Sequence, residues 1–330
     1  MTASDRSPAA PSAGGPAPSP GDGGPAAARP APTGSASGAA SGSASGAASG
    51  SAARARLGGV GMVLGSAFSL QFGSAVAALL FPRAGALGVV ALRLVFSAAL
   101  MLAVCRPRLR GHSRSDWAAA VGLGIALGTM NSLFYQAIDR IPLGAAVTLE
   151  LLGPLVLSVV AARRAASLLW AGLALGGVYL LGASDFDGLA PAGVGFALAA
   201  GAMWSAYIVF NARTGARFPK ADGLALAMGV AALVSAPLGL FSAGTALLDP
   251  VTLGLGAAVA VLSSGLPYTL ELFALRRLPA ATFAVLMSLM PVAATTAGFL
   301  VLGQSLGGVQ LAAIALVVAA SMGAVRTARS

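Results

Sequence analysis

Charged residues, cysteine and histidine are all scarce in this sequence, and each scarcity excludes a class of protein. Only 9% of the 330 residues are charged, against about 25% in soluble domains, so the chain cannot cover a water-facing surface. The single cysteine, Cys105, excludes an internal disulfide. With one histidine, His112, no His/Cys metal site is available. We therefore expect no metal and no cofactor.

Apolar sequence is what the chain has in abundance. Hydrophobic residues make up 57% of it and the mean hydropathy is +0.85. A transmembrane helix needs roughly 20 apolar residues, and ten such segments follow one another. They lie at about 57–80, 86–105, 117–137, 143–162, 168–184, 192–211, 222–242, 251–274, 280–302 and 309–325. The sequence predicts an all-α integral membrane protein with ten transmembrane helices in a lipid bilayer.

Residues 1–53 have a different composition, built from Ala, Gly, Ser and Pro. Such a segment cannot bury enough apolar area to fold, so it is predicted to be a disordered, low-complexity tail. Two interpretations stay open for it: a flexible appendage without a specific role, or a regulatory or partner-binding segment.

The basic residues predict the orientation in the membrane. The net charge of +10 raises the possibility of a nucleic-acid partner, but the basic residues are spread over separate short segments rather than gathered in one patch. Alternate loops carry nearly all of them, and the loops between carry only Arg83 and Arg140. Because cytoplasmic loops are rich in Lys and Arg, we expect both termini in the cytoplasm of a multi-pass cell-membrane protein that binds no nucleic acid.

Two segments in the chain are near copies of one another. Pro142 to Pro154 reads PLGAAVTLELLGP and Pro279 to Pro291 reads PAATFAVLMSLMP, and similar turns, AIDRIP and ALRRLP, lead into them. The copies lie five spans apart, an odd number, so they run in opposite directions through the membrane. This predicts two inverted five-helix repeats, 57–184 and 192–325, with a substrate site near the midplane where they meet.

Three ionisable residues lie inside predicted spans, where a charge costs at least ~2.5–3.5 kcal/mol. Arg93 and Glu150 fall at a similar depth, and a buried ion pair is the economical arrangement for them. The pair could be structural, or Glu150 could take up a proton or a cationic group while Arg93 meets a substrate carboxylate. Glu271 lies near the cytoplasmic end of its span and could pair with Arg276 or Arg277, or act as a proton or substrate contact at an inner gate.

Neutral polar side chains and prolines complete the candidate site. In lipid, polar helix faces turn inward, either toward a cavity or toward another helix. The candidate binding residues of this kind are Gln71, Asn131, Tyr135, Trp204, Tyr207 and Tyr268. Pro154, Pro267 and Pro291 lie inside spans and release backbone carbonyls there, so they are candidate hinges or gates.

The stretches FYQAIDRIPLGAAVTLELLGP, YTLELFALRRLPAATFAVLMSLMP and FLVLGQSL resemble the EamA family of the drug/metabolite transporter superfamily, and within it the threonine/homoserine exporter type. The resemblance covers about residues 57–325. It implies a ten-helix bundle of two inverted repeats, a central cavity, export of amino acids or related metabolites, and proton coupling. Two positions depart from the family pattern, since Met290 and Gln304 stand where the family often has glutamate.

The favoured hypothesis is a secondary transporter that exports small metabolites such as threonine or homoserine by alternating access, with proton coupling. A passive facilitator or a non-transporting membrane scaffold is the alternative. A membrane-embedded enzyme using Glu150 and Glu271 is disfavoured, because the spans offer no metal cluster, no phosphate-binding loop and no nucleophile–histidine arrangement.

Overall fold

The computed structural model describes residues 41–162, 165–183, 190–219, 221–275 and 277–327, with side chains described from Leu57 onward except at scattered positions. Within these ranges the chain is helical and contains no strand. The elements are α1 (Ser41–Ala78), α2 (Phe81–Cys105), α3 (Arg114–Ile138), α4 (Leu143–Glu150), α5 (Leu152–Ala162), α6 (Ala165–Ala183), α7 (Pro191–Gly215), α8 (Asp222–Ala243), η1 (Gly244–Leu248), α9 (Pro250–Ala260), η2 (Val261–Gly265), α10 (Leu266–Leu275), α11 (Ala280–Met287), α12 (Met290–Leu302) and α13 (Gly308–Thr327).

Nine helical segments of the described residues are long and apolar enough to cross a membrane. In α1 this segment is Leu57–Ala78. The fifth predicted span corresponds to α6, whose described apolar part, Leu169–Leu180, is shorter than the other nine. The protein is therefore an all-helical, multi-pass membrane protein. The first forty residues of the predicted disordered tail lie outside the described residues, whereas residues 41–53 form the first part of helix α1. Disorder of the first forty residues stays a prediction.

Local sequence signals explain where several helices begin. Ser113 caps α3 by accepting the N–H of Asp116, whose carboxylate accepts the N–H of Ser113 in return. Asp249 caps α9, because its carboxylate accepts the N–H of Thr252 at 2.9 Å and its hydroxyl at 3.0 Å. These bonds favour the ionised form and lower the pKa of Asp249.

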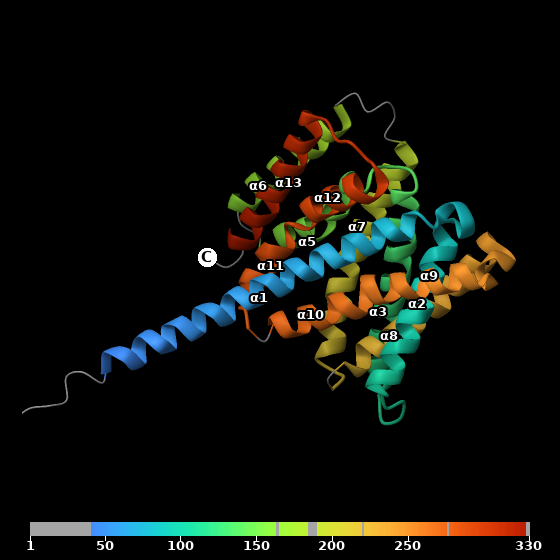
Figure 1. The fold of residues 1–330 in the computed structure, drawn as a ribbon, viewed down its shortest axis with the longest axis horizontal. Helices are drawn as coiled ribbons and strands as arrows, with labels where there is room; N and C mark the ends of the chain where they lie inside the picture. Colours follow the sequence, from blue (N-terminus) through green and yellow to red (C-terminus); the bar gives the residue numbers. More distant parts are fainter. Residues whose placement is uncertain (1–40, 163–164, 184–189, 220, 276, 328–330) are drawn as a thin grey trace, which may run out of the picture. The chain divides into compact units, whose positions relative to one another are not determined.

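The helices pack in a defined set of pairs. Helix α2 packs along α8, α3 packs against both α7 and α8, α6 runs beside α13, and α4 lies against α12 and α7 (Figure 1). Glycines permit the closest crossing, between the α4–α5 segment and α7. A Cβ atom at Gly201 would overlap the backbone carbonyl of Glu150, and one at Gly153 would overlap that of Gly201. Backbones can approach this closely only where neither residue has a side chain.

Two of the spans are broken at equivalent positions. Helices α4 and α11 are both eight residues long, and α11 begins and ends 137 positions after α4 (280 against 143, 287 against 150). Each is followed by a turn and then by a second helix, α5 or α12, that contains a proline in its first turn. A third irregularity, the π-helical turn η2, stands directly before Pro267. Each interruption thus precedes a proline that cannot continue the helical hydrogen bonding.

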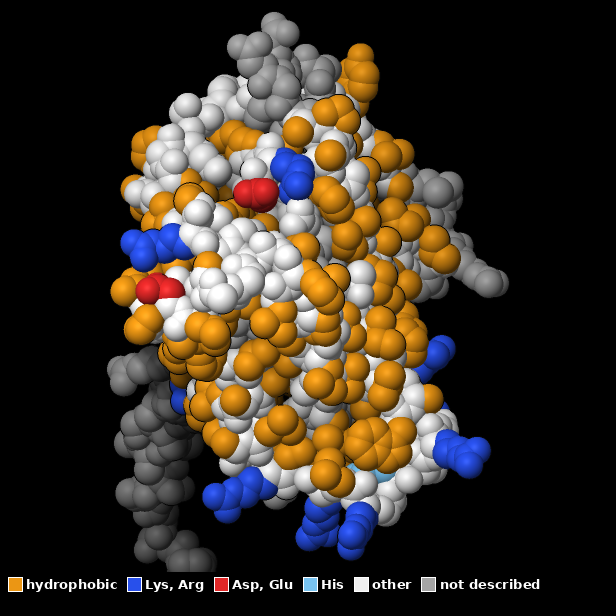
Figure 2. Space-filling view, turned by 90° about the vertical axis from the view of Figure 1, so that its right-hand side faces the viewer, with side chains coloured by type: hydrophobic (Ala, Val, Ile, Leu, Met, Phe, Trp, Pro, Cys, Tyr) orange, Lys and Arg blue, Asp and Glu red, His pale blue; other side chains and the backbone are white. Residues whose placement is uncertain are grey.

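The surface has the distribution of side chains that a bilayer requires. Apolar side chains cover much of the face in Figure 2, while most of its lysine and arginine side chains lie toward the lower end and others lie beside the acidic side chains in the upper part. Large apolar side chains on several helices are exposed, among them Phe241 at 92% and Leu233 at 74%. Exposed apolar area on this scale belongs against lipid.

The Gly153–Gly201 crossing can be tested with a matched pair of glycines on α7. Gly201→Val would force the backbones apart, so we expect the free energy of unfolding to fall by about 1–3 kcal/mol through overpacking. Gly195→Val is the control, because a Cβ at Gly195 meets nothing within 4 Å. Thermal unfolding of the purified variants measures the difference, and equal melting temperatures would contradict a close crossing.

Candidate functional site

A cavity of about 510 Å³ lies inside the helical bundle and is lined by residues from both halves of the chain. Seven of the nine predicted binding residues line it, as do two of the three predicted hinge prolines. Those lining residues are Gln71, Arg93, Asn131, Glu150, Trp204, Tyr207, Glu271, Pro154 and Pro267. Pro291 is buried in α12 and does not line it, and the side chain of Tyr268 lies outside the described part. A cavity of this size lined by both halves is a candidate substrate site.

Arg93 is the positive charge of the cavity and is 5% exposed. Its Nη1 donates to the hydroxyl of Tyr135 at 3.1 Å, and its Nη2 donates to the carbonyl of Ser263 at 3.3 Å. Its Nε has no hydrogen-bond partner in the described part of the chain. The guanidinium is therefore held by two neutral partners, and its buried Nε–H is left without one.

The carbonyl of Ser263 is available to Arg93 because of Pro267. A proline has no N–H to donate to the carbonyl four residues earlier, and its ring pushes that carbonyl aside. The π-helical turn η2 contains this position, and the carbonyl of its neighbour Leu262 accepts the hydroxyl of Ser69 at 2.6 Å. Two carbonyls at the interruption are thus satisfied by side chains from α1 and α2. Pro267 thus frees the carbonyl that Arg93 binds, and its role as a hinge stays a prediction.

Tyr135 was predicted to face the substrate, but it is fully buried and does not line the cavity. Its ring packs against Phe81 and Phe134, and the guanidinium of Arg93 lies 5.6 Å from the ring centroid. Tyr135 therefore holds the guanidinium of Arg93 in place without lining the cavity itself.

Glu150 is the last residue of α4 and is 8% exposed. It lines the same cavity as Arg93, but the expected ion pair between them does not form. Among the described residues the ion pair within 4 Å is Arg140–Asp139, on the protein surface. The guanidinium of Arg93 is bound instead by the hydroxyl of Tyr135 and the carbonyl of Ser263. The cavity therefore presents a cationic group and a carboxyl group separately.

Glu271 lies on α10 and accepts a hydrogen bond from the hydroxyl of Ser66 at 2.7 Å. Arg276 lies outside the described residues, and Arg277 forms no ion pair with Glu271. Ser66 is fully buried on α1, and sequence analysis did not identify it because no motif marks it. Glu271 thus belongs to the cavity wall, fixed by a partner from the first helix.

Asn131 and Gln71 differ in their hydrogen bonding. Asn131 donates its amide to the carbonyl of Leu127 on its own helix at 2.9 Å. Gln71 is 2% exposed, and its Oε1 has no partner among the described residues. Trp204 and Tyr207 are half-buried and line the cavity from α7. The described residues contain no group of three or more His, Cys, Asp or Glu side chains that could hold a metal ion.

The two positions that depart from the family pattern also have defined places. Met290 lines the cavity at the start of α12. Gln304 lies beyond the end of α12, and its Oε1 accepts the backbone N–H of Leu143, the first residue of α4, at 3.0 Å. Sequence analysis noted Gln304 only as a missing carboxylate, whereas the structure makes it a hydrogen-bond acceptor for the helix that carries Glu150.

Known proteins with similar sequences are transporters. Residues 191–326 match the EamA-like transporter family. The threonine/homoserine exporter RhtA of Escherichia coli strain K12 is 40% identical over 263 residues, which are 79% of this chain and 89% of that protein. RhtA of Salmonella typhimurium strain LT2 gives the same identity and coverage.

A solved crystal structure has a similar fold. It aligns with 82% of this chain and 98% of its own, with a TM-score of 0.54 at 20% sequence identity. The sequence relatives extend over most of both chains, so the likeness is not confined to one motif. The predicted resemblance is confirmed, and membership of a transporter family rather than an enzyme family is established: the chain belongs to the EamA-like transporter family.

Proposed function

We propose that the protein exports threonine, homoserine and related small amino acids across the cell membrane by alternating access. The observation that carries this is the cavity in which Arg93 and Glu150 are both buried without pairing with one another. An amino acid is a zwitterion, so its carboxylate would bind Arg93 and its ammonium would bind Glu150. The relatives named as exporters of threonine and homoserine support the choice of substrate.

The energetics favour a zwitterion over a neutral solute. A buried charge without a counter-charge is costly, whereas a paired and hydrogen-bonded one is tolerated. Arg93 has a free Nε, and Gln71 has a free Oε1 in the same cavity. A bound amino acid would satisfy all of these groups together, which makes binding selective for molecules with both charges.

We further propose that the two halves form the inverted repeats expected from the sequence, with ten transmembrane helices. The matching lengths and 137-residue offset of α4 and α11 support this, and cavity-lining positions follow the same offset. The lining pairs separated by 137 positions are Leu70 and Tyr207, Gln71 and Ile208, Ser74 and Asn211, Met130 and Pro267, Phe134 and Glu271, Glu150 and Met287, and Leu151 and Ser288. Inverted repeats that share one central site are the arrangement of alternating-access transporters.

The halves differ in how tightly their half-helices are packed. All eight residues of α4 are buried, whereas the described residues of α11, such as Phe283 and Met287, are half-buried or exposed. The cavity extends to Asn211 near the end of α7 and to Val325 near the end of α13. This asymmetry supports a state that is closed at the α4 end and open toward the ends of α7 and α13.

The orientation follows from the charges. Arginine-rich segments flank the ends of α2, α7 and α13, and most basic side chains on the face in Figure 2 lie toward one end. By the positive-inside rule, we propose that this end and both termini are cytoplasmic. The open cavity would then receive its substrate from the cytoplasm, as export requires.

The export proposal is tested with everted membrane vesicles that contain the protein. We expect threonine uptake when the vesicle interior is made acidic, because a proton leaving by way of Glu150 drives the exchange. Glu150→Gln cannot carry a proton, so accumulation against the gradient should be lost. Unchanged gradient-driven uptake in Glu150→Gln would remove this residue from the coupling.

A second variant tests the carboxylate site. Arg93→Gln removes the buried cation, so we expect the KM for threonine to rise roughly 30-fold or more, as when one partner of a buried charge pair is truncated. Arg83→Gln is the matched control, because Arg83 is exposed in the first turn of α2. The same KM for the two variants would contradict carboxylate binding by Arg93.

A passive facilitator is the second candidate, favoured by the two lost family carboxylates, since Met290 and Gln304 cannot carry protons. Reconstitution in liposomes distinguishes it from the exporter. A facilitator equilibrates threonine without regard to an imposed pH gradient, whereas a coupled exporter accumulates it.

A further inference from the structure

Helix α4 runs from the central cavity toward a second, shallower pocket. Glu150, its last residue, lines the central cavity. Gln304, which binds its first residue, Leu143, lines the second pocket together with Asp139. Eight helical residues span about 12 Å, and all eight are buried. The half-helix is therefore buried along its whole length and has one of these pockets near each end.

The start of α4 depends on a residue from the other half of the chain. The first N–H groups of a helix have no partner within it, and Pro142, which precedes α4, supplies no side-chain cap. The Oε1 of Gln304, 161 positions away, accepts the N–H of Leu143 at 3.0 Å. A helix cap is usually a neighbour in sequence, so a cap from a distant segment ties two parts of the bundle together.

Gln304 is well placed for this contact. Gly303 ends α12 with a left-handed backbone (φ 64°), and the N–H of Gln304 bonds to the carbonyl of Gly298 at 3.1 Å. A Cβ at Gly298 would lie 2.6 Å from the Oε1 of Gln304, so this glycine leaves room for the side chain. The turn after α12 thus aims the amide at the start of α4.

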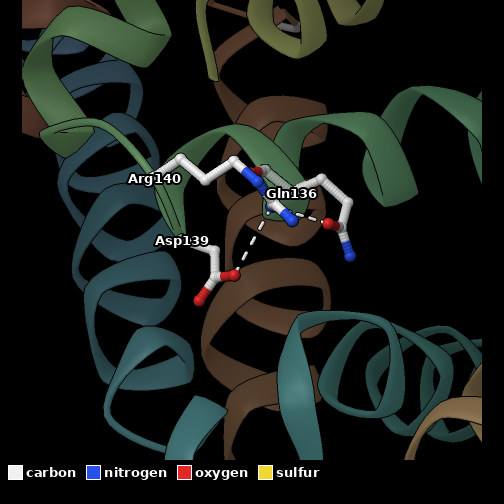
Figure 3. Close-up of polar contacts among 3 residues, drawn as sticks. All are labelled: Gln136, Asp139 and Arg140. Carbon is white, nitrogen blue, oxygen red and sulfur yellow. Dashed lines mark hydrogen bonds and ion pairs between the residues drawn. The ribbon is translucent and has the colours of Figure 1, made fainter. Parts of the chain in front are cut away.

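The turn that leads into α4 is fastened separately (Figure 3). The Nη1 of Arg140 donates to the carbonyl and to the Oε1 of Gln136 at 2.7 and 2.6 Å and forms the ion pair with Asp139 at 3.4 Å. Its guanidinium also lies 5.1 Å from the centroid of the Phe196 ring on α7. This turn stays with α3 and α7, while Gln304 connects α4 itself to the segment after α12.

We propose that Gln304 is the latch of an α4 gate: its hydrogen bond to Leu143 holds α4 closed, and release of this bond joins the central cavity to the pocket beside Asp139. The looser packing of α11, the equivalent half-helix, indicates that such a segment need not be fully buried. Gln304 touches no substrate in the cavity and acts through α4 as a positioning residue. The proposal rests on the proposed function in that the opened path is the route of export.

Cysteine labelling tests the latch. In a Cys105→Ser background, which removes the single cysteine, Ala146→Cys places a reporter at a fully buried position of α4. A membrane-impermeant maleimide is applied to intact cells and to everted vesicles. Gln304→Met keeps the length of the side chain but removes the amide acceptor, so we expect labelling to rise roughly fivefold, as for loss of one helix cap, and from one side of the membrane alone.

Two further variants make the test specific. Gln304→Glu keeps an acceptor oxygen and should restore the original labelling rate. Gln310→Met is the matched control, because Gln310 also accepts a helix-start N–H, that of Gly307 at 2.6 Å, but caps its own helix. Should Gln304→Met fail to fold, Gln304→Asn carries the same test, since its amide is one methylene too short to reach Leu143.

Unchanged labelling in Gln304→Met and Gln304→Asn would overturn the latch, and so would an equal rise in Gln310→Met. A rise from both sides of the membrane would also overturn it, since it would mean general loosening. The labelling requires no substrate, so its failure leaves the export test unaffected. Equally, a lack of threonine export would refute the proposed function without changing the labelling result.

Discussion

Prolines determine where polar backbone atoms become available inside this bundle. In the hydrocarbon region a carbonyl cannot turn to water, and each proline leaves the carbonyl four residues before it without a helical donor. Pro267 does this to Ser263, whose carbonyl then accepts Arg93. Pro154 stands four residues after Glu150, where α4 ends, and Pro291 stands four residues after Met287, where α11 ends. The helix breaks and the charged groups therefore meet at the cavity.

The arginine shows how a charge is kept in such a place. Arg93 is bound by a neutral hydroxyl and a neutral carbonyl rather than by a carboxylate. A buried pair with Glu150 would neutralise both groups and leave little for a ligand to gain. Under the proposed function, neutral partners leave the charge of the guanidinium uncompensated until a substrate enters the cavity, which suits a site that must bind and release.

Under the proposed repeat, the two halves supply the same positions with different chemistry. At the offset of 137 positions, Glu150 corresponds to Met287, Phe134 to Glu271, and Gln71 to Ile208. In each of these pairs one half of the chain supplies a polar residue and the other half supplies an apolar residue. A zwitterion with a short side chain needs such a division, because its charged end and its carbon chain require different surroundings.

The sequence by itself determined the helices, the family, and the three charged residues that line the cavity, Arg93, Glu150 and Glu271. Hydropathy and proline spacing act over a few residues, so they can be read along the chain, and buried charges such as Glu150 are conspicuous there. Only the tertiary structure decided the partners: Ser263 for Arg93, Ser66 for Glu271 and Gln304 for Leu143 are 170, 205 and 161 positions apart. The tertiary structure also gave Arg93 the partners Tyr135 and Ser263 in place of the expected Glu150, and it left Tyr135 outside the cavity lining. Hydrogen-bond partners depend on which helices pack together, and no local pattern encodes that packing.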